Sequence, residues 1–139
     1  MSEPDLSSIG RYKLLDRISV GGMAEVFRAK AVGDAGFEKV VAIKRILPHM
    51  ADDREFVDMF IDEARTVAQL NHANICQIFE FGQDRGTYFI ALELVEGRDL
   101  KRIMEYHRLR GRATPLNIAL YIVRRILEAL DYAHNCTNS

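Results

Sequence analysis

The sequence predicts an α+β fold in which strands dominate the N-terminal part and helices the C-terminal part. Up to residue 95, short segments rich in β-branched and aromatic residues recur between glycine-containing turns, which is typical of antiparallel strands. Three further segments repeat their apolar residues every three to four positions, which indicates helices. The predicted order is three strands, one helix, two strands and then two helices.

The first three strands are separated by recognisable turn residues. Residues 12–29 form a strand pair, because alternating apolar residues are interrupted there by Gly21 and Gly22. Residues 32–39 contain glycine and aspartate and are predicted to be a loop. The short apolar run at 40–47 is predicted to be the third strand, since a proline stops it.

A helix is predicted at 53–70, followed by a hairpin. Asp52 is expected to cap the helix, with Glu55 three residues later completing a pair like a capping box. The acidic first turn also suits the positive end of the helix dipole. Strands are predicted at 75–81 and 87–95, and the segment from Gly82 to Gly86 between them is predicted to be the hairpin turn.

Two helices complete the predicted order. The first runs from Asp99 to about His107. The second runs from Thr114 to about His134, with Thr114 as its cap and Pro115 at its first position. This second helix is apolar on most of its faces, so we expect it to be buried by more protein than the chain provides. We therefore expect association that depends on concentration.

Composition excludes several classes of protein. The chain has 139 residues, enough for one domain at most, and its 19 Lys and Arg residues nearly balance 20 Asp and Glu residues. A net charge of −1 gives no general attraction to nucleic acid or to anionic membranes. Cys76 and Cys136 are 60 positions apart, which predicts free thiols in a reducing compartment. The first residues lack a basic region followed by an apolar run, and no apolar run reaches about 18 residues, so we expect no signal peptide and a cytoplasmic protein.

Two local features could carry chemistry near the N-terminus. Gly21 and Gly22 stand between two strands, and glycine lets backbone N–H groups approach phosphate oxygens closely. A Gly-Gly hairpin turn also has a purely structural interpretation. Lys44 ends an apolar strand, and its ammonium group must either reach water or find an anion, because an unpaired buried charge is costly.

A third feature is Glu63 in the helix predicted at 53–70. Spacings of four and three residues place one stripe of side chains on the predicted inner face: Phe56, Phe60, Glu63, Val67 and Leu70. A carboxylate in an apolar stripe needs a partner, and Lys44 is the nearest cation in sequence whose strand directs it inward. Alternatively, Glu63 lies at the edge of the stripe and reaches water, or it pairs with Arg65.

A glycine turn, an inward lysine and a helical glutamate, in this order, resemble the arrangement that holds a nucleoside triphosphate in protein kinases. The chain is similar to the N-terminal lobe of Hanks-type kinases, specifically the bacterial eukaryotic-like Ser/Thr kinases. The matching segments are Gly-Arg-Tyr-Lys-Leu-Leu from residue 10, Gly-Gly-Met-Ala-Glu-Val from 21, Val-Ala-Ile-Lys at 41–44, Asp-Glu-Ala-Arg at 62–65, Asn-His-Ala-Asn-Ile at 71–75 and Leu-Val-Glu-Gly-Arg-Asp-Leu at 94–100.

This resemblance implies a domain organisation for the chain. A tail at 1–9 would precede a kinase N-lobe at 10–97, with a five-stranded antiparallel sheet and one helix. Residues 98–139 would form the first helices of an incomplete C-lobe. The polar end of the chain would then be a cut made just before the catalytic loop.

The resemblance also implies contacts with ATP. The loop over the phosphates would consist of Ser19, Val20, Gly21, Gly22, Met23 and Ala24. Lys44 would contact the α- and β-phosphates while paired to Glu63. Around the adenine and ribose would lie Val26 and Ala42 over the ring, Leu92 at the gatekeeper position, Glu93 and Val95 with hinge backbone groups, and Asp99 near the ribose. Ser19 and Ala24 replace two glycines of the family's pattern; these small residues keep the loop narrow but reduce its conformational freedom.

The implied function is ATP-dependent phosphoryl transfer to serine or threonine of a protein, with ATP and Mg²⁺. The family's His-Arg-Asp catalytic loop and Asp-Phe-Gly motif, whose aspartate holds Mg²⁺, do not occur in the 139 residues. We therefore expect activity from a complete domain and none from this chain alone. The alternative is a non-catalytic split or decayed kinase module that binds nucleotide or a partner protein, including the missing lobe or a second copy.

Other candidate sites have simpler interpretations. The histidines have no metal-ligand spacing, so no metal site is predicted. His72 is expected to form hydrogen bonds that fix the turn before the fourth strand. Residues 98–112 hold six Lys and Arg residues but a single tyrosine, which favours a solvated face over a nucleic-acid surface.

Overall fold

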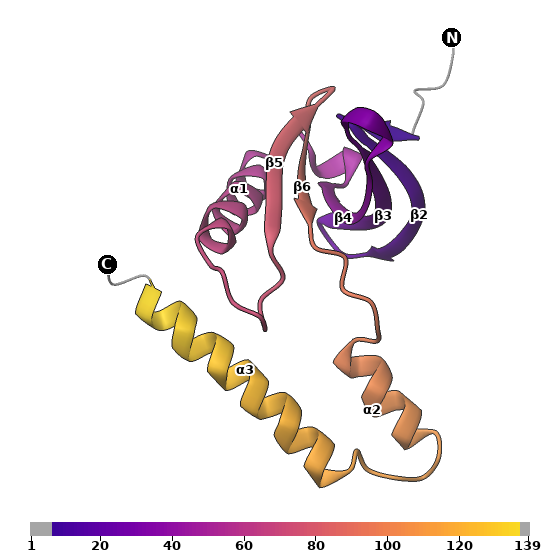
Figure 1. Ribbon diagram of the computed structural model, residues 1–139, viewed down its shortest axis with the longest axis vertical. Helices are drawn as coiled ribbons and strands as arrows, with labels where there is room; N and C mark the ends of the chain where they lie inside the picture. The colour runs from indigo at the N-terminus through magenta and orange to yellow at the C-terminus, as the bar shows by residue number, and fades with distance from the viewer. Residues whose placement is uncertain (1–6, 137–139) are drawn as a thin grey trace. The chain divides into compact units, whose positions relative to one another are not determined.

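The computed structural model describes residues 7–136, which divide into two compact units. One unit consists of the residues up to 71 together with Cys76–Leu94, and the other of His72–Ile75 together with the residues from Val95 onward. Figure 1 shows the elements of both units. In chain order they are β1 (Ser8–Ile9), β2 (Tyr12–Val20), β3 (Ala24–Val32), β4 (Glu38–Ile46), α1 (Arg54–Ala68), β5 (Ile78–Asp84), β6 (Thr87–Leu92), α2 (Leu100–Arg108) and α3 (Leu116–Cys136), with short 3₁₀ turns at Asp34–Gly36 and Pro48–Met50.

The first unit is an antiparallel sheet with α1 beside it, so the predicted α+β fold class is confirmed. The sheet has six strands in the order β1-β2-β3-β4-β6-β5, one more than the five predicted. The additional strand, β1, has only two residues. Its partners in β2 are Lys13 and Tyr12.

The sheet curls until its two edges meet. Tyr12 donates its hydroxyl hydrogen to Glu80 Oε2 at 2.5 Å, and the Gly10 N–H donates to Asp84 Oδ2 at 3.1 Å. These bonds join the β1–β2 edge to β5, the strand at the other edge. Burial, and then the hydrogen bond to Glu80, raise the pKa of Tyr12, so the phenol stays protonated and remains a donor at neutral pH.

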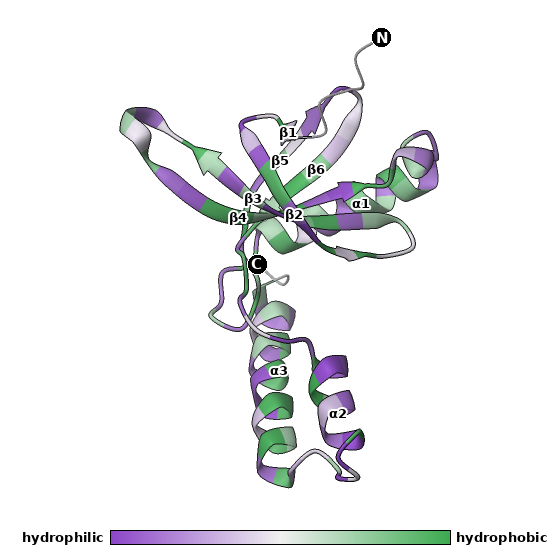
Figure 2. Cartoon of the chain, turned by 90° about the vertical axis from the view of Figure 1, so that its right-hand side faces the viewer, coloured by the Kyte–Doolittle hydropathy of each residue, from purple (hydrophilic) through white to green (hydrophobic). Residues whose placement is uncertain are grey.

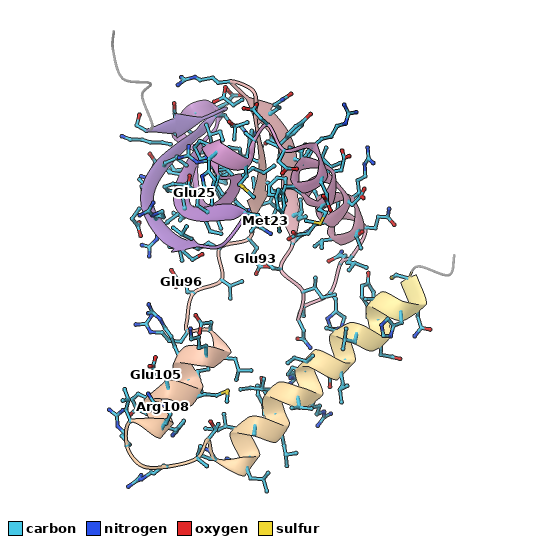
Figure 3. All side chains as sticks on the ribbon, turned by 180° about the vertical axis from the view of Figure 1, so that it is seen from behind. Met23, Glu25, Glu93, Glu96, Glu105 and Arg108 are labelled. Carbon is cyan, nitrogen blue, oxygen red and sulfur yellow. The ribbon has the colours of Figure 1, made fainter. Side chains whose placement is uncertain are left out.

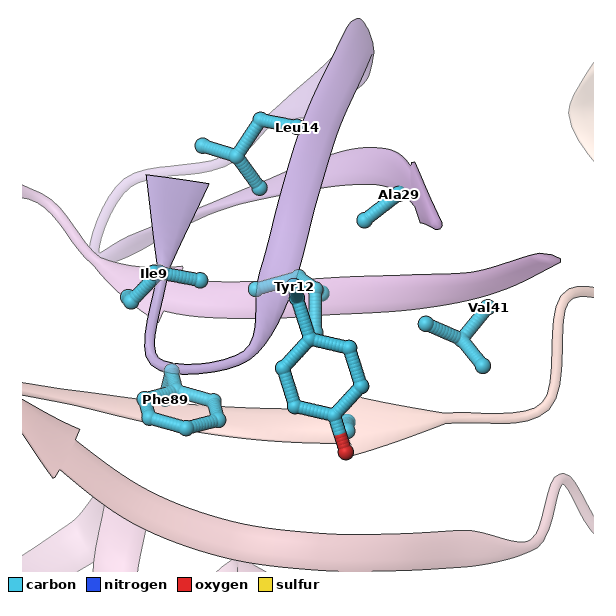
Figure 4. Close-up of a cluster of buried hydrophobic side chains, with 8 residues drawn as sticks. Ile9, Tyr12, Leu14, Ala29, Val41 and Phe89 are labelled. Atoms are coloured by element: carbon cyan, nitrogen blue, oxygen red, sulfur yellow. The ribbon is translucent and has the colours of Figure 1, made fainter. Parts of the chain in front are cut away.

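Two apolar clusters lie on opposite faces of the sheet. The cluster inside the curl is shown in Figure 4 and consists of Ile9, Tyr12, Leu14, Ala29, Val41, Ile43, Phe89 and Ala91. Its rings of Tyr12 and Phe89 meet edge to face at 5.9 Å. The second cluster packs α1 onto the other face through Ile46, Phe60, Ala64 and Ile90. Successive side chains of β4 and β6 point to opposite faces, so each of these strands contributes some residues to one cluster and some to the other.

The cap and the buried face of α1 both differ from the prediction. Asp53, not Asp52, is the N-cap, and its side chain accepts a hydrogen bond from the Glu55 N–H at 3.1 Å. The buried residues of the helix are Phe60 and Ala64. Glu63 thus lies at the edge of the apolar stripe rather than at its centre.

The β5–β6 hairpin turns later than predicted. Its two-residue turn is Arg85-Gly86, with φ of +48° and +80°, which is the conformation that a tight two-residue hairpin requires. Gly82, predicted to begin the turn, lies inside β5 instead. A Cβ atom at Gly82 would be 2.7 Å from Cζ of Phe89, so glycine leaves the space that this ring occupies.

The second unit contains α2, α3 and the segment His72–Ile75. Asp99 is the N-cap of α2, and its Oδ1 accepts a hydrogen bond from the Arg102 N–H at 2.8 Å. Helix α3 begins at Leu116, with the Pro115 carbonyl accepting its first hydrogen bonds, one residue later than predicted. Figure 2 shows apolar and polar residues alternating along α3. Within 7–136, no helix is long and apolar enough to cross a membrane.

The segment His72–Ile75 is held to α3 by side-chain contacts. The Asn74 amide donates to the Arg125 carbonyl at 3.0 Å and to Glu128 Oε2 at 3.3 Å, and the His72 ring lies 5.1 Å from that of Tyr132. His72 Nδ1 also accepts a hydrogen bond from the Asn74 N–H at 3.0 Å. The predicted role of His72 in fixing this turn is confirmed.

Candidate functional site

The turn between β2 and β3 is exposed and anchored at both ends. The Gly21 N–H donates to the Ala24 carbonyl at 2.8 Å, and the Met23 carbonyl accepts from the Leu47 N–H at 2.9 Å. In the described part of the chain, the N–H groups of Gly22 and Met23 form no backbone hydrogen bond. A Cβ at Gly22 would meet nothing within 4 Å. Two backbone donors at this turn therefore remain available to an anion.

Lys44 and Glu63 form an ion pair between β4 and α1. Lys44 Nζ donates to Glu63 Oε1 at 2.5 Å. The Lys44 side chain is 25% exposed and that of Glu63 is 50% exposed, so the pair is open to solvent on one side. Arg65, the alternative partner of Glu63, lies 3.8 Å from Asp62 instead. The pair thus leaves the ammonium group accessible to a second anion while fixing its position.

The ion pair forms part of the wall of a small cavity in the first unit. Met23 of the turn, Ile46 of β4 and Phe60 of α1 also line it. Its volume of about 50 Å³ suits one or two water molecules and is too small for a nucleotide. The cavity therefore shows that the glycine turn, β4 and α1 meet at Lys44, without itself being a ligand site.

A mainly apolar surface continues from Lys44 along the same face of the sheet. Val26 lies opposite Lys44 in the β3–β4 register, and Ala42 lies opposite Leu92 in the β4–β6 register. Because opposed residues in an antiparallel pair share a face, and residues 42 and 44 are two apart, all four side chains are on one face. Ala42 is buried, and Val26 and Leu92 are half-buried.

Glu93 directly follows β6 and is tied to the segment before β5. Its N–H donates to the Gln77 carbonyl at 2.9 Å, and its own carbonyl accepts from the Cys76 thiol at 3.2 Å. Burial, and then the charge of Glu93, raise the pKa of Cys76, so this thiol stays protonated and can donate. A carbonyl oxygen has two lone pairs, and that of Glu93 can accept a further hydrogen bond.

Two residues assigned to the same site by resemblance belong to the second unit. Val95 is 69% exposed, and Asp99 uses one carboxylate oxygen to cap α2. The structure therefore gives Asp99 a structural role as a helix cap, and its contact with a ribose stays a prediction. The same holds for the nucleotide contacts of the other residues named from the sequence.

One charged group near the glycine turn was missed by sequence reasoning. Glu25 is 4% exposed, and its carboxylate contacts Arg45 Nε at 2.7 Å and Arg17 Nη1 at 3.6 Å. The sequence held one indication that Glu25 faces inward: it stands two positions before the apolar Phe27 in an alternating strand, so the two side chains share a face. Figure 3 shows Glu25 among the curled strands of the first unit.

Comparison with known proteins decides the family. The protein kinase domain family matches residues 12–137. The chain belongs to the protein kinase family. The predicted resemblance to bacterial Hanks-type kinases is confirmed: "Serine/threonine-protein kinase PrkC" of Bacillus subtilis is 38% identical over 125 residues, covering 90% of this chain and 18% of that protein. "Tyrosine-protein kinase MasK" of Myxococcus xanthus is 41% identical over 135 residues, covering 97% of this chain and 21% of that protein.

Solved kinase structures give the same result for the fold. A crystal structure of the Mycobacterium tuberculosis PknI kinase domain matches with a TM-score of 0.76 and 29% identity, over 97% of this chain and 53% of that one. This kinase chain thus spans about a fifth of the two curated relatives and about half of the solved kinase domain. The curled sheet with α1 corresponds to a kinase N-lobe, and α2 and α3 correspond to part of a C-lobe.

Proposed function

We propose that this chain is the ATP-binding half of a protein kinase that transfers the γ-phosphoryl group of ATP to a serine or threonine hydroxyl. The observation that carries the proposal is the Lys44–Glu63 pair, at 2.5 Å, beside an exposed glycine turn that has free backbone donors. A reaction that consumes ATP belongs in the cytoplasm, where ATP is available.

Each group at this face has a distinct part in binding. The N–H groups of Gly22 and Met23 would receive phosphate oxygens, and Lys44 would neutralise phosphate charge while Glu63 fixes its position. The apolar surface of Val26, Ala42 and Leu92 would cover the flat adenine ring and exclude water from it. The Glu93 carbonyl would accept a hydrogen bond from the exocyclic amine. These contacts bind and orient the nucleotide.

We propose no Mg²⁺ ligand among the described residues. Across 7–136, no group of three His, Cys, Asp or Glu side chains could hold a metal ion. When bound in this family, Mg²⁺ neutralises charge that develops on the transferred phosphoryl group. The family's Asp-Phe-Gly motif, whose aspartate holds Mg²⁺, does not occur in the 139 residues, so the proposed contribution of this chain is to hold the nucleotide.

The proposal predicts different results for this chain and for a complete kinase domain that contains it. With ATP labelled at the γ-phosphate and a generic protein substrate, the complete domain should produce labelled phosphoserine and phosphothreonine. The chain alone should transfer no label above a Lys44→Met control, because it lacks the group that orients the substrate hydroxyl. Label found mainly on tyrosine would overturn the assignment to Ser/Thr, and the similarity to MasK makes this outcome worth measuring.

A second candidate function is a non-catalytic module that associates with protein. The observation in its favour is α3, whose only buried residue within 7–136 is Ala129. Its exposed apolar side chains are Leu116, Ile118, Leu120, Tyr121, Val123, Ile126, Leu127 and Leu130. An apolar surface of this kind is typically covered by protein.

This candidate predicts that the chain alone associates with a second copy. Light scattering should show a mass that rises with concentration above the 15.9 kDa of one chain. A Leu120→Glu, Leu127→Glu double variant should stay monomeric, because the charges make burial of this face unfavourable. A wild-type chain that remains monomeric at all concentrations would contradict the prediction.

A further inference from the structure

The second half of β2, next to the glycine turn, has little apolar packing to hold it. All residues from Leu15 to Val20 are exposed, including the large apolar side chains of Ile18 and Val20. The pairing with β3 is also irregular between Arg17 and Ser19. The strand that leads into the turn is therefore held by backbone hydrogen bonds and ion pairs rather than by a core.

Glu25 is placed to supply the missing support. It is the only charged side chain among the buried residues of the described chain, and it stands directly opposite both Val20 and Arg45 in the strand registers. One carboxylate oxygen contacts Arg45 on β4 and the other faces Arg17 on β2, at 2.7 and 3.6 Å. A single carboxylate thus links three adjacent strands at the end of the sheet that carries the glycine turn.

Arg45 is itself fixed. Its side chain is 14% exposed, and its guanidinium carbon lies 4.8 Å from the centre of the Phe27 ring. A guanidinium held by a ring and a carboxylate has few other positions. Arg45 also follows Lys44 directly, so successive side chains of β4 point to opposite faces: Lys44 to Glu63, and Arg45 to Glu25.

We propose that the Glu25–Arg45–Arg17 cluster is a positioning device that holds the glycine turn at the distance from Lys44 that a triphosphate requires. None of these three side chains contacts the proposed nucleotide face, so they act through the backbone of the turn. The backbone bonds most directly affected are Gly21 N–H to Ala24 O and Leu47 N–H to Met23 O. The effect on nucleotide rests on the proposed function, whereas the mechanical effect on the turn does not.

The mechanical effect can be tested in the 139-residue chain by amide hydrogen exchange. In Glu25→Gln, exchange at Gly21 and Leu47 should be about tenfold faster, because a charge-assisted contact is lost while Arg45 keeps its charge. The matched control is Glu38→Gln, which removes the 2.9 Å pair with Lys30 on the same two strands at their other end. Equal exchange rates at Gly21 and Leu47 in the two variants would overturn the proposal.

The functional consequence is tested by comparing ATP with adenosine in a complete kinase domain that contains the chain. Glu25→Gln should weaken ATP binding about five- to tenfold and leave adenosine binding within twofold, since only ATP meets the turn. A general structural loss would weaken both ligands equally and would overturn the positioning role. An Arg45→Lys variant should restore part of the ATP affinity lost in Arg45→Met. If Glu25→Gln speeds amide exchange but the protein binds neither ATP nor adenosine, the proposed function is rejected, whereas the mechanical effect of the Glu25–Arg45–Arg17 cluster on the turn is supported.

Discussion

Lys44→Met is expected to lower the rate of phosphoryl transfer by a complete kinase domain about a hundredfold or more. The ammonium group is the only cation that the structure places at the junction of the glycine turn, β4 and α1 within 7–136, and Glu63 holds it in place at 2.5 Å. Removing one preorganised donor that stabilises developing negative charge lowers kcat about 10²–10³-fold in other enzymes. Methionine keeps the length and the apolar stem of the side chain, so the fold should survive.

The control for this variant is Lys39→Met. Lys39 lies on the same strand, where its ammonium group is 3.7 Å from the centre of the Phe79 ring and away from the proposed phosphate face. Its replacement should leave the transfer rate within about twofold, since it removes only an exposed cation–π contact. Glu63→Gln should give an intermediate loss, because Lys44 keeps its charge but loses its fixed partner. Wild-type rates in Lys44→Met would exclude the proposed role of the ion pair.

Phe89→Ala is expected to lower the free energy of unfolding of the first unit by about 3–5 kcal/mol, the range for deleting a buried aromatic ring. Phe89 is 3% exposed, lies in the cluster inside the curled sheet, and contacts Tyr12 edge to face. A loss of this size is a large part of the stability of a small domain. Denaturant unfolding followed by circular dichroism measures it. Phe37→Ala, at a ring that is 67% exposed, is the control and should change stability by about 0.5 kcal/mol or less.

The neighbouring glycine provides a sharper check on the cause of this loss. Gly82→Ala should destabilise the wild type by about 1–3 kcal/mol, because the new Cβ would lie 2.7 Å from the Phe89 ring. In the Phe89→Ala background the same methyl group enters the space left by the ring and should recover part of the stability. If Gly82→Ala has the same effect in both backgrounds, the contact between these two residues does not explain the loss.

Most of the fold could be predicted because its signals are local and repeated. The strands of the sheet other than β1 and all three helices follow apolar periodicity, and their ends follow glycine and proline. The predictions were wrong at the hairpin turn, at the helix cap and at β1, where the sequence pattern alone does not determine the structure. Gly82 resembles a turn residue until the ring of Phe89 is known to fill the space above it. Asp52 and Asp53 are equivalent candidates for a cap in sequence, and β1 is too short to show any period.

Sequence reasoning likewise found part of the candidate site and missed another part. Lys44 could be named from sequence as a partner for Glu63, because its strand directs it inward, but water and Arg65 remained alternatives, and only the structure shows the pair with Lys44. Glu25 was missed despite its alternation with Phe27, since a carboxylate in a strand is ordinarily exposed and the partners of Glu25 lie on two other strands. Its burial depends on the curl of the sheet, which arises from contacts between distant residues such as Tyr12 and Glu80.

Lys44 and Arg45, adjacent on β4, also disfavour a shifted register between β4 and β3. In the native register, Glu25 pairs with the planar guanidinium of Arg45, which lies over the Phe27 ring inside the curl. If β4 shifted by one residue along β3, Arg45 would face α1 instead, and Lys44 would take its place inside the curl. The compact ammonium group of lysine cannot reproduce that stacked contact, and both carboxylates would lose their fitted partners at once. Two neighbouring charges with different shapes thus disfavour a one-residue shift of β4 along β3.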